Sequence, residues 1–452
     1  MTRKQPVKAL RWKLLPALLL AATTTLAQQP TAEPQPPAPL ALPLAEALRL
    51  GLQNSLDVQV SRAEAEIRAA QAGAGFAGGL PTIGFTAANT ENFTTLRQEL
   101  TNGTIINRTG VRSNQTAASL TGTLTLFNGG RVRATRQRLD ELTAQGELQL
   151  NAAIQQVLAD VQLRYYTVVL RQRYIRTLEA SVAVSRQKLA LVNQRQAVGL
   201  ANNADRFQAE LDLNTQLQTQ RDQRLAVRQA TAELQRALNA PDVTAAFTVE
   251  DTIPLDRTLR WADIQAALTR NPGLLAAERA ERIAALVEQE TRALRIPALN
   301  LNGGANVNRN QSTAGFTLLN QTYGPFVGLS LNVPIYNGGT SRRLERVARL
   351  GTQTAQAQRQ ATQRDNELAA YSAWLAYEQN LQQVDSAEVA FATARQLLQL
   401  TQLRLAAGLA TLVDVRIAQQ TFEAAGYGLA NYRFAAKAAE IGLKQVAAIL
   451  EP

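Results

Sequence analysis

Residues 132–198 carry an apolar pattern that repeats every seven positions. Gly and Pro are absent from this stretch apart from Gly146, and Gln, Ala, Arg and Leu dominate it, which favours one long helix. The apolar positions of the repeat are Ile154, Val161, Val168, Ile175, Val182 and Leu189. A seven-residue repeat kept over this length predicts a left-handed coiled coil, on the order of 100 Å long at ~1.5 Å per residue.

The same pattern returns 209 residues later. Its heptad positions there are Ala370, Tyr377, Val384, Phe391 and Leu398. Other features that return are Asn128-Gly129-Gly130 as Asn337-Gly338-Gly339, Arg195 as Arg404, Gly199 as Gly408 and Asp205 as Asp414. A duplication that keeps its register predicts two copies of one structural unit. We expect a first repeat over residues 44–249, a loop at 250–260 and a second repeat over 261–452.

Each long helix is predicted to end at a sharp tip. Gly199 and Gly408 stop the helices, each has an Arg in the turn before it, and a new helix begins within about three residues. The result is one helical hairpin in each repeat. Because the helix surfaces are polar and the predicted length is several times a bilayer thickness, the hairpins are expected to cross an aqueous space.

Two segments with a period of two precede each long helix. They predict strands, each apolar on one face and small-polar on the other, at about 82–92, 116–127, 298–307 and 325–336. The intervening residues 94–115 and 308–322 are expected to be long polar loops. Each segment alone also fits a soluble sheet, but uncharged polar faces favour a membrane barrel. Since four strands cannot close a barrel and lipid does not tolerate open edges, several subunits would share one.

The first 43 residues predict export. Residues 1–27 have the features of a signal peptide: five basic residues, a short apolar run and small residues at the expected cleavage positions. Residues 28–43 are Pro-rich and read as a tether. Loss of the five basic residues would lower the net charge from +11 to +6, and Arg is scattered along the helices, which excludes nucleic acid as the expected partner.

Composition argues against an enzyme. The chain contains no His and no Cys, so the commonest general base, a thiol nucleophile, the usual zinc ligands and a Cys lipid anchor are all missing. We therefore expect no cofactor and no metal. A coiled-coil scaffold or adhesin at the surface or in the periplasm is the main alternative, since heptads alone allow it. The four amphipathic strands favour a membrane channel over that alternative.

The order of short motifs, repeated twice, resembles the TolC family of outer-membrane efflux and secretion channels over residues 44–450. The motifs are Asn54 and Asn271-Pro272 in the leading helices, Pro81 and Pro297 before the strands, L-F-N-G-G at 126–130, I-Y-N-G-G at 335–339, V-G-L-A at 198–201 and A-G-L-A at 407–410. The resemblance implies a homotrimer with a shared 12-stranded barrel and a coiled-coil tunnel. It also implies a passive exit duct in the outer membrane, working with a periplasmic adaptor and an inner-membrane pump of the RND or ABC type.

The resemblance also implies roles for the hairpin tips. The matching adaptor-docking positions are Val198, Gly199, Leu200, Ala407, Gly408 and Leu409. Asp414 matches an acidic ring that constricts the closed pore, and Asp205 matches an aspartate in the links between tips. The chain departs from the family pattern at Leu405, Ala410 and Ile417, so the bonds that close its pore are expected to differ.

Each of these tip residues also has a purely structural explanation. Asn202 and Thr411 are good N-caps, and an acidic residue three positions later, Asp205 or Asp414, complements the helix dipole. Arg195 and Arg404 suit helix C-termini in the same way, and Val198 and Leu200 suit turn packing. Capping alone and capping combined with a pore role both remain open for the two aspartates.

Overall fold

The computed structural model describes residues 40–242, 247–315 and 317–451. The expected signal peptide and residues 28–39 of the expected tether lie outside this part of the chain. From residue 41 onward the chain forms one compact unit. Its helices are α1 (Leu44–Asn54), α2 (Leu56–Gln71), α3 (Arg131–Ala197), α4 (Asn203–Ala237), α5 (Trp261–Leu268), α6 (Pro272–Ala293), α7 (Thr340–Ala406) and α8 (Leu412–Val446). Its strands are β1 (Leu40–Leu42), β2 (Thr82–Glu99), β3 (Ile105–Phe127), β4 (Phe247–Val249), β5 (Ala298–Ser312) and β6 (Leu319–Asn332).

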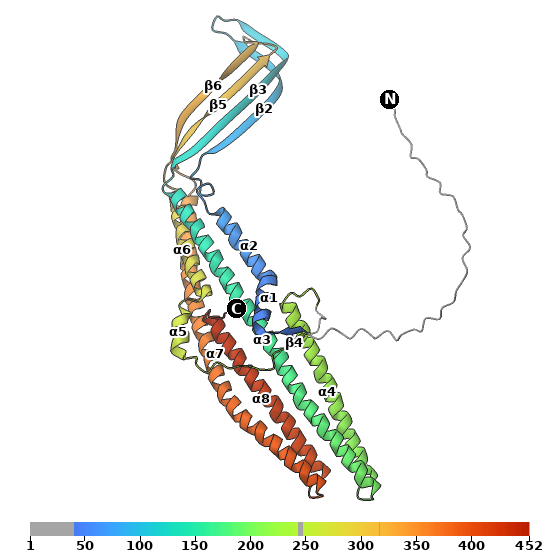
Figure 1. Cartoon of the computed structure of the whole chain (residues 1–452). Helices are drawn as coiled ribbons and strands as arrows, with labels where there is room; N and C mark the ends of the chain where they lie inside the picture. The colour runs from blue at the N-terminus through green and yellow to red at the C-terminus, as the bar shows by residue number, and fades with distance from the viewer. Residues whose placement is uncertain (1–39, 243–246, 316, 452) are drawn as a thin grey trace, which may run out of the picture. The chain divides into compact units, whose positions relative to one another are not determined.

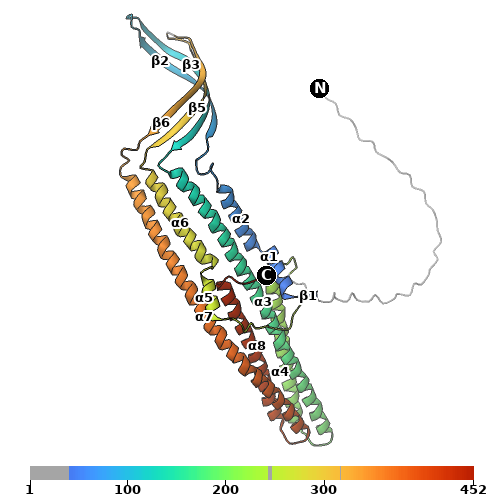
Figure 2. The same cartoon turned by 60° about the vertical axis from the view of Figure 1, so that its left-hand side comes forward.

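The long helices have the same lengths in both halves. α3 and α7 each contain 67 residues, and α4 and α8 each contain 35. α3 with α4 and α7 with α8 form two antiparallel hairpins, whose tips lie at the end of this unit away from the larger sheet (Figure 1). Nearer the sheet, α2, α3, α6 and α7 lie side by side (Figure 2).

Buried heptad positions form the seams of the hairpins. Val161 and Val168 of α3 and Tyr377 and Val384 of α7 are almost fully buried. The largest apolar cluster surrounds the middle of α3, where Tyr165 donates a hydrogen bond to the Leu42 carbonyl (3.1 Å). Among the described residues, no helix is both long enough and apolar enough to span a membrane.

The larger sheet has the antiparallel order β2-β3-β5-β6. Its two hairpins are longer than the sequence predicted: the expected loops at 94–115 and 308–322 are mostly strand, and the connecting turns are at 100–104 and 313–318. The prediction was wrong because polar and charged residues were read as loop. They pair across strands instead, as where the Asn114 side chain donates to the Glu91 carboxylate (2.8 Å).

Three other boundaries differ from the expected ones. β6 covers residues 319–332, not 325–336, and Pro334, which has no N–H to donate, lies just beyond its end. Each half begins with two helices where the motif pattern predicts one helix before the strands, and the breaks lie at Ser55 and just before Pro272. Residues 40–42, expected in the tether, form β1, which pairs with β4.

Candidate functional site

The first hairpin tip is built around Gly199. Gly199 has φ of +77°, a left-handed conformation that suits Gly. Its N–H donates to the Gln196 carbonyl (3.0 Å), and the Leu200 N–H donates to the Arg195 carbonyl (2.8 Å). These two bonds form a Schellman motif, which satisfies the last carbonyls of α3 and reverses the chain.

The second tip repeats this geometry at Gly408, which has φ of +78°. The Gly408 N–H donates to the Leu405 carbonyl (3.0 Å) and the Leu409 N–H to the Arg404 carbonyl (2.8 Å). The stop signals predicted from the sequence therefore act at both tips through the same backbone bonds.

Asp205 and Asp414 both close capping boxes. Asp205 accepts a hydrogen bond from the Asn202 N–H (3.1 Å), and the Asn202 side chain accepts one from the Asp205 N–H (2.9 Å). At the other tip Asp414 accepts from the N–H and the hydroxyl of Thr411, both at 2.8 Å. The capping explanation is thus present in the geometry, and it leaves the pore role as a proposal.

The exposed Asp414 carboxylate is held in its charged form. Hydrogen bonds from the backbone and side chain of Thr411, with a smaller contribution from the positive charge of Arg404, lower the pKa of Asp414 below its usual range. The carboxylate therefore remains an acceptor and a fixed negative charge at pH values where an ordinary aspartate begins to protonate.

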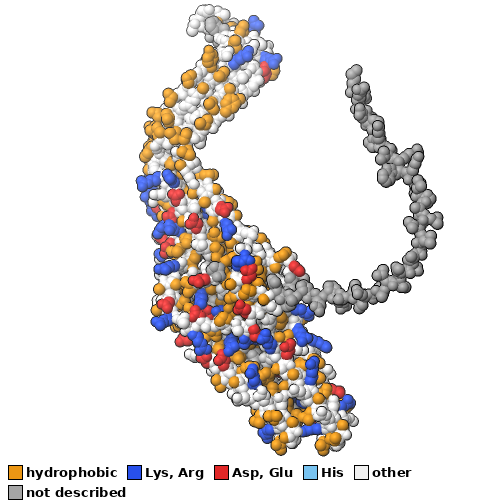
Figure 3. Space-filling model, viewed as in Figure 1, with side chains coloured by type: hydrophobic (Ala, Val, Ile, Leu, Met, Phe, Trp, Pro, Cys, Tyr) orange, Lys and Arg blue, Asp and Glu red, His pale blue; other side chains and the backbone are white. Residues whose placement is uncertain are grey.

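Apolar side chains project from both tips into solvent. Val198, Leu200 and Leu409 are 69%, 77% and 70% exposed. Ala407 and both tip glycines are exposed as well. Figure 3 shows hydrophobic side chains at the ends of both hairpins. Most of the surface of these side chains is exposed, so the two tips carry a small exposed apolar surface.

The two tip arginines differ, which the sequence did not predict. Arg195 reaches across to the second hairpin and donates to the carbonyls of Leu405 (2.5 Å) and Ala406 (3.4 Å) at the end of α7. It therefore caps a helix of the other hairpin and joins the two tips. Arg404 is exposed. Only the tertiary arrangement brings α7 to Arg195, so the contact left no signal in the sequence.

Above the tips, a buried polar seam joins α3 to α8. Gln419 of α8 donates to Ser185 (2.9 Å) and to the Ser181 carbonyl (3.1 Å) of α3. Nearby, Lys188, with its side chain 1% exposed, pairs with Asp212 of α4 (2.5 Å). Sequence reasoning missed this seam because these residues lie between the heptad positions.

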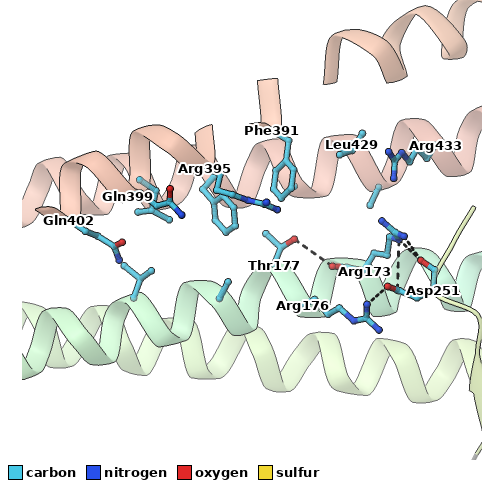
Figure 4. Close-up of a pocket in the computed structure, with 16 residues that line it drawn as sticks. Arg173, Arg176, Thr177, Asp251, Phe391, Arg395, Gln399, Gln402, Leu429 and Arg433 are labelled. Carbon is cyan, nitrogen blue, oxygen red and sulfur yellow. Dashed lines mark hydrogen bonds and ion pairs between the residues drawn. The ribbon is translucent and has the colours of Figure 1, made fainter. Parts of the chain in front are cut away.

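A cleft of about 460 Å³ lies between α3 and the second hairpin (Figure 4). Arg173 and Arg176 on one side hold Asp251, while Arg395 lies over the Phe391 ring on the other. At this level the hairpins meet through these polar contacts around the cleft and through an apolar cluster in which Val184 of α3 packs against Leu398 of α7 and Phe422 of α8.

The fold is that of solved outer-membrane channels. VceC of Vibrio cholerae, for example, superposes with a TM-score of 0.75 over 90% of this chain and 96% of that structure, at 18% identity. Two segments of the chain, residues 47–240 and 264–448, match the outer membrane efflux protein family, and the chain belongs to this family.

Two known proteins are similar to this chain in sequence. CyaE of Bordetella pertussis is 26% identical over 325 residues, which cover 70% of this chain and 65% of CyaE. The outer membrane protein TolC of Vibrio cholerae is 25% identical over 308 residues, which cover 64% of this chain and 67% of TolC. The chain thus spans about two thirds of the length of either relative.

Proposed function

We propose that this chain is one subunit of a homotrimeric outer-membrane channel, the passive exit duct of an efflux pump or a type I secretion system. The observation that carries the proposal is the open sheet. β2 and β6 are both edge strands without a second neighbour, and their side chains Ile83, Phe85, Val327 and Leu329 are between 67% and 80% exposed. Unpaired edges and apolar faces together require further strands and an apolar surrounding.

Three copies would join their four strands into the expected 12-stranded barrel. The helices of each subunit would then continue the barrel as a tunnel toward the periplasm. Export by a signal peptide, without attachment through a Cys, is part of the same proposal. Family membership supports a channel in the outer membrane over a scaffold or adhesin, and a transport protein over an enzyme.

The hairpin tips would serve as the gate and as the docking site of a periplasmic adaptor, which links the duct to an inner-membrane pump of the RND or ABC type. The exposed Val198, Leu200 and Leu409 support docking. The exposed, charged Asp414 supports a constriction, because three copies around one axis would form a ring that attracts cations. Asp205 would belong to the same gate, as part of the links that hold the tips together.

The test is single-channel conductance of the purified protein in planar bilayers. We expect discrete openings with a preference for cations, and we expect Asp414→Ala to weaken that preference. Asp205→Ala is the comparison variant, since it removes a carboxylate from the equivalent capping box, and a smaller loss of cation preference there would place the main constriction at Asp414. Openings without any effect of Asp414→Ala would reduce Asp414 to a helix cap, and folded trimers that never insert would contradict the channel itself.

A further inference from the structure

Five exposed arginines gather where the long helices leave the sheet. We call them the arginine belt: Arg131, Arg133 and Arg136 of α3, with Arg342 and Arg346 of α7. Within the described residues, none of these five side chains pairs with an acidic residue. Figure 3 shows Lys and Arg side chains at this end of the helices, next to the sheet.

Three acidic residues near the belt already pair with other arginines. Glu345 pairs with Arg295 (3.1 Å), Glu288 with Arg292 (3.0 Å) and Glu290 with Arg138 (2.7 Å). These carboxylates are largely covered by their partners. The belt keeps a surplus of positive charge, because the exposed Asp140, four residues after Arg136, adds a single carboxylate beside five arginines.

The belt also opposes the dipoles of its own helices. Neither α3 nor α7 has an acidic residue in its first turn, and each begins after a Gly that provides no capping side chain. Positive side chains at a helix N-terminus are unfavourable because that end already carries partial positive charge. The same arrangement in both halves suggests that an anion outside the chain compensates for it.

The position of the belt indicates which anion. Phe127, four residues before Arg131, is 53% exposed, and Tyr336, six residues before Arg342, is 86% exposed. Exposed aromatic residues between an apolar surface and a basic one are typical of the boundary between membrane and water. On the other side of these aromatics lie the exposed apolar side chains of the strands, so the belt is placed at the level of lipid headgroups.

A cleft within the belt has the size and lining for a headgroup. It measures about 410 Å³ and lies between the start of α3 and the end of α6. Arg133 and Arg292 line it together with Gln137, and Ile296 provides an apolar wall. The Arg133 guanidinium and the Gln137 amide suit a phosphate, and Ile296 suits the first carbons of an acyl chain, while Arg292 already pairs with Glu288.

We propose that the arginine belt binds the phosphate groups of phospholipids in the leaflet that faces the helices, with one headgroup held by Arg133 and Gln137 in this cleft. The inference rests on the proposed insertion of the sheet into the outer membrane. The belt would then set the depth of the channel in the bilayer, because moving it in either direction would separate guanidinium groups from phosphates.

The test uses the full-length protein in nanodiscs of phosphatidylethanolamine with a minor fraction of phosphatidylglycerol. Bound lipids are counted by native mass spectrometry after release from the nanodisc. The belt variant changes all five arginines to Gln. The control variant makes the same change in charge at exposed arginines far from the sheet: Arg186, Arg221, Arg228, Arg270 and Arg364.

We expect the wild type and the control to retain phosphatidylglycerol and the belt variant to lose it. Arg133→Gln alone should weaken retention about fivefold, the value expected for one arginine near an anionic surface. Equal retention by all variants would overturn the proposal, as would loss of retention on adding inorganic phosphate alone, which would indicate a site for the free ion.

The same samples separate this inference from the proposed function. Wild-type protein that does not enter bilayers at all would contradict the channel. Wild-type protein that inserts and conducts, but shows no lipid difference from the belt variant, would overturn only the belt. The belt variant, with all five arginines changed to Gln, is first checked for folding by its thermal unfolding. If it does not fold, the single variants Arg133→Gln and Arg342→Gln are compared with Arg186→Gln.

Discussion

α3 and α7 have the same length and lie 209 residues apart, yet they bury different faces. α8 covers one face of α3, where Gln419 donates to the fully buried Ser181, and further along α3 Lys188 is 3% exposed and pairs with Asp212 of α4. The matching positions on α7 are Ala390 and Leu397, both of which are exposed, Leu397 by 46%. One face is therefore closed within the chain, and its counterpart is left open.

The difference indicates what closes the second face. Since α4 is the counterpart of α8 in the other half, α4 of a neighbouring copy would cover α7 as α8 covers α3. The open face of α7 in each subunit would contact α4 of the next subunit. This head-to-tail arrangement would close into a ring. This reasoning supports assembly of several copies independently of the sheet edges.

The largest expected effect comes from placing a charge on the open face. Leu397→Glu should abolish the trimer, because assembly would bury an unpaired carboxylate in each subunit. Size-exclusion chromatography with light scattering measures the outcome. Leu397→Ala removes only apolar area and should still form trimers. Trimers of Leu397→Glu as stable as the wild type would show that this face is not an interface.

A smaller effect is expected at the matching position on α3. Lys188→Met leaves Asp212 buried without its main partner and should lower the free energy of unfolding by about 2–3 kcal/mol, less than a full buried pair because Arg416 lies 4.0 Å from Asp212.

Chemical denaturation checks this value. The double change Lys188→Met with Asp212→Leu should restore most of the loss, and Leu397→Met, at the matching position of α7, should stay within about 0.5 kcal/mol of the wild type. A loss at Leu397→Met as large as that at Lys188→Met would contradict the difference between the two faces.

The smallest effect concerns the pH dependence of the tips. The depressed pKa of Asp414 means that its stabilising bonds are fully present above the usual aspartate pKa and are lost as the pH falls through the lowered value. Thr411→Ala removes the hydroxyl that donates to Asp414 and should raise this pKa toward normal. Cation preference should then disappear at a higher pH in conductance titrations. Asn202→Ala, at the other tip, should leave the titration unchanged.

The regular features of the chain could be predicted from local patterns. The two 67-residue helices, their glycine stops and the capping boxes at Asp205 and Asp414 follow from periodicity and from a few residue types at fixed spacing. The lengths of the strands could not be predicted in this way. Glu91, Arg112 and Asn114 are residue types common in loops, and only the opposite strand supplies their partners. With these partners, the polar segments extend the hydrogen-bonded pairing of β2 with β3.

The sequence by itself determined the repeat, the coiled-coil hairpins and the positions of the tips, since these depend on interactions between residues close together in the chain. Only the tertiary structure decided which residues at matching positions of the two repeats make the same contacts and which do not. Arg195 caps α7 while Arg404 is exposed, and α8 covers α3 while the same face of α7 stays open. Two halves with the same register of helices and tips acquire different surroundings because, in a single chain, each half has the other on one side only.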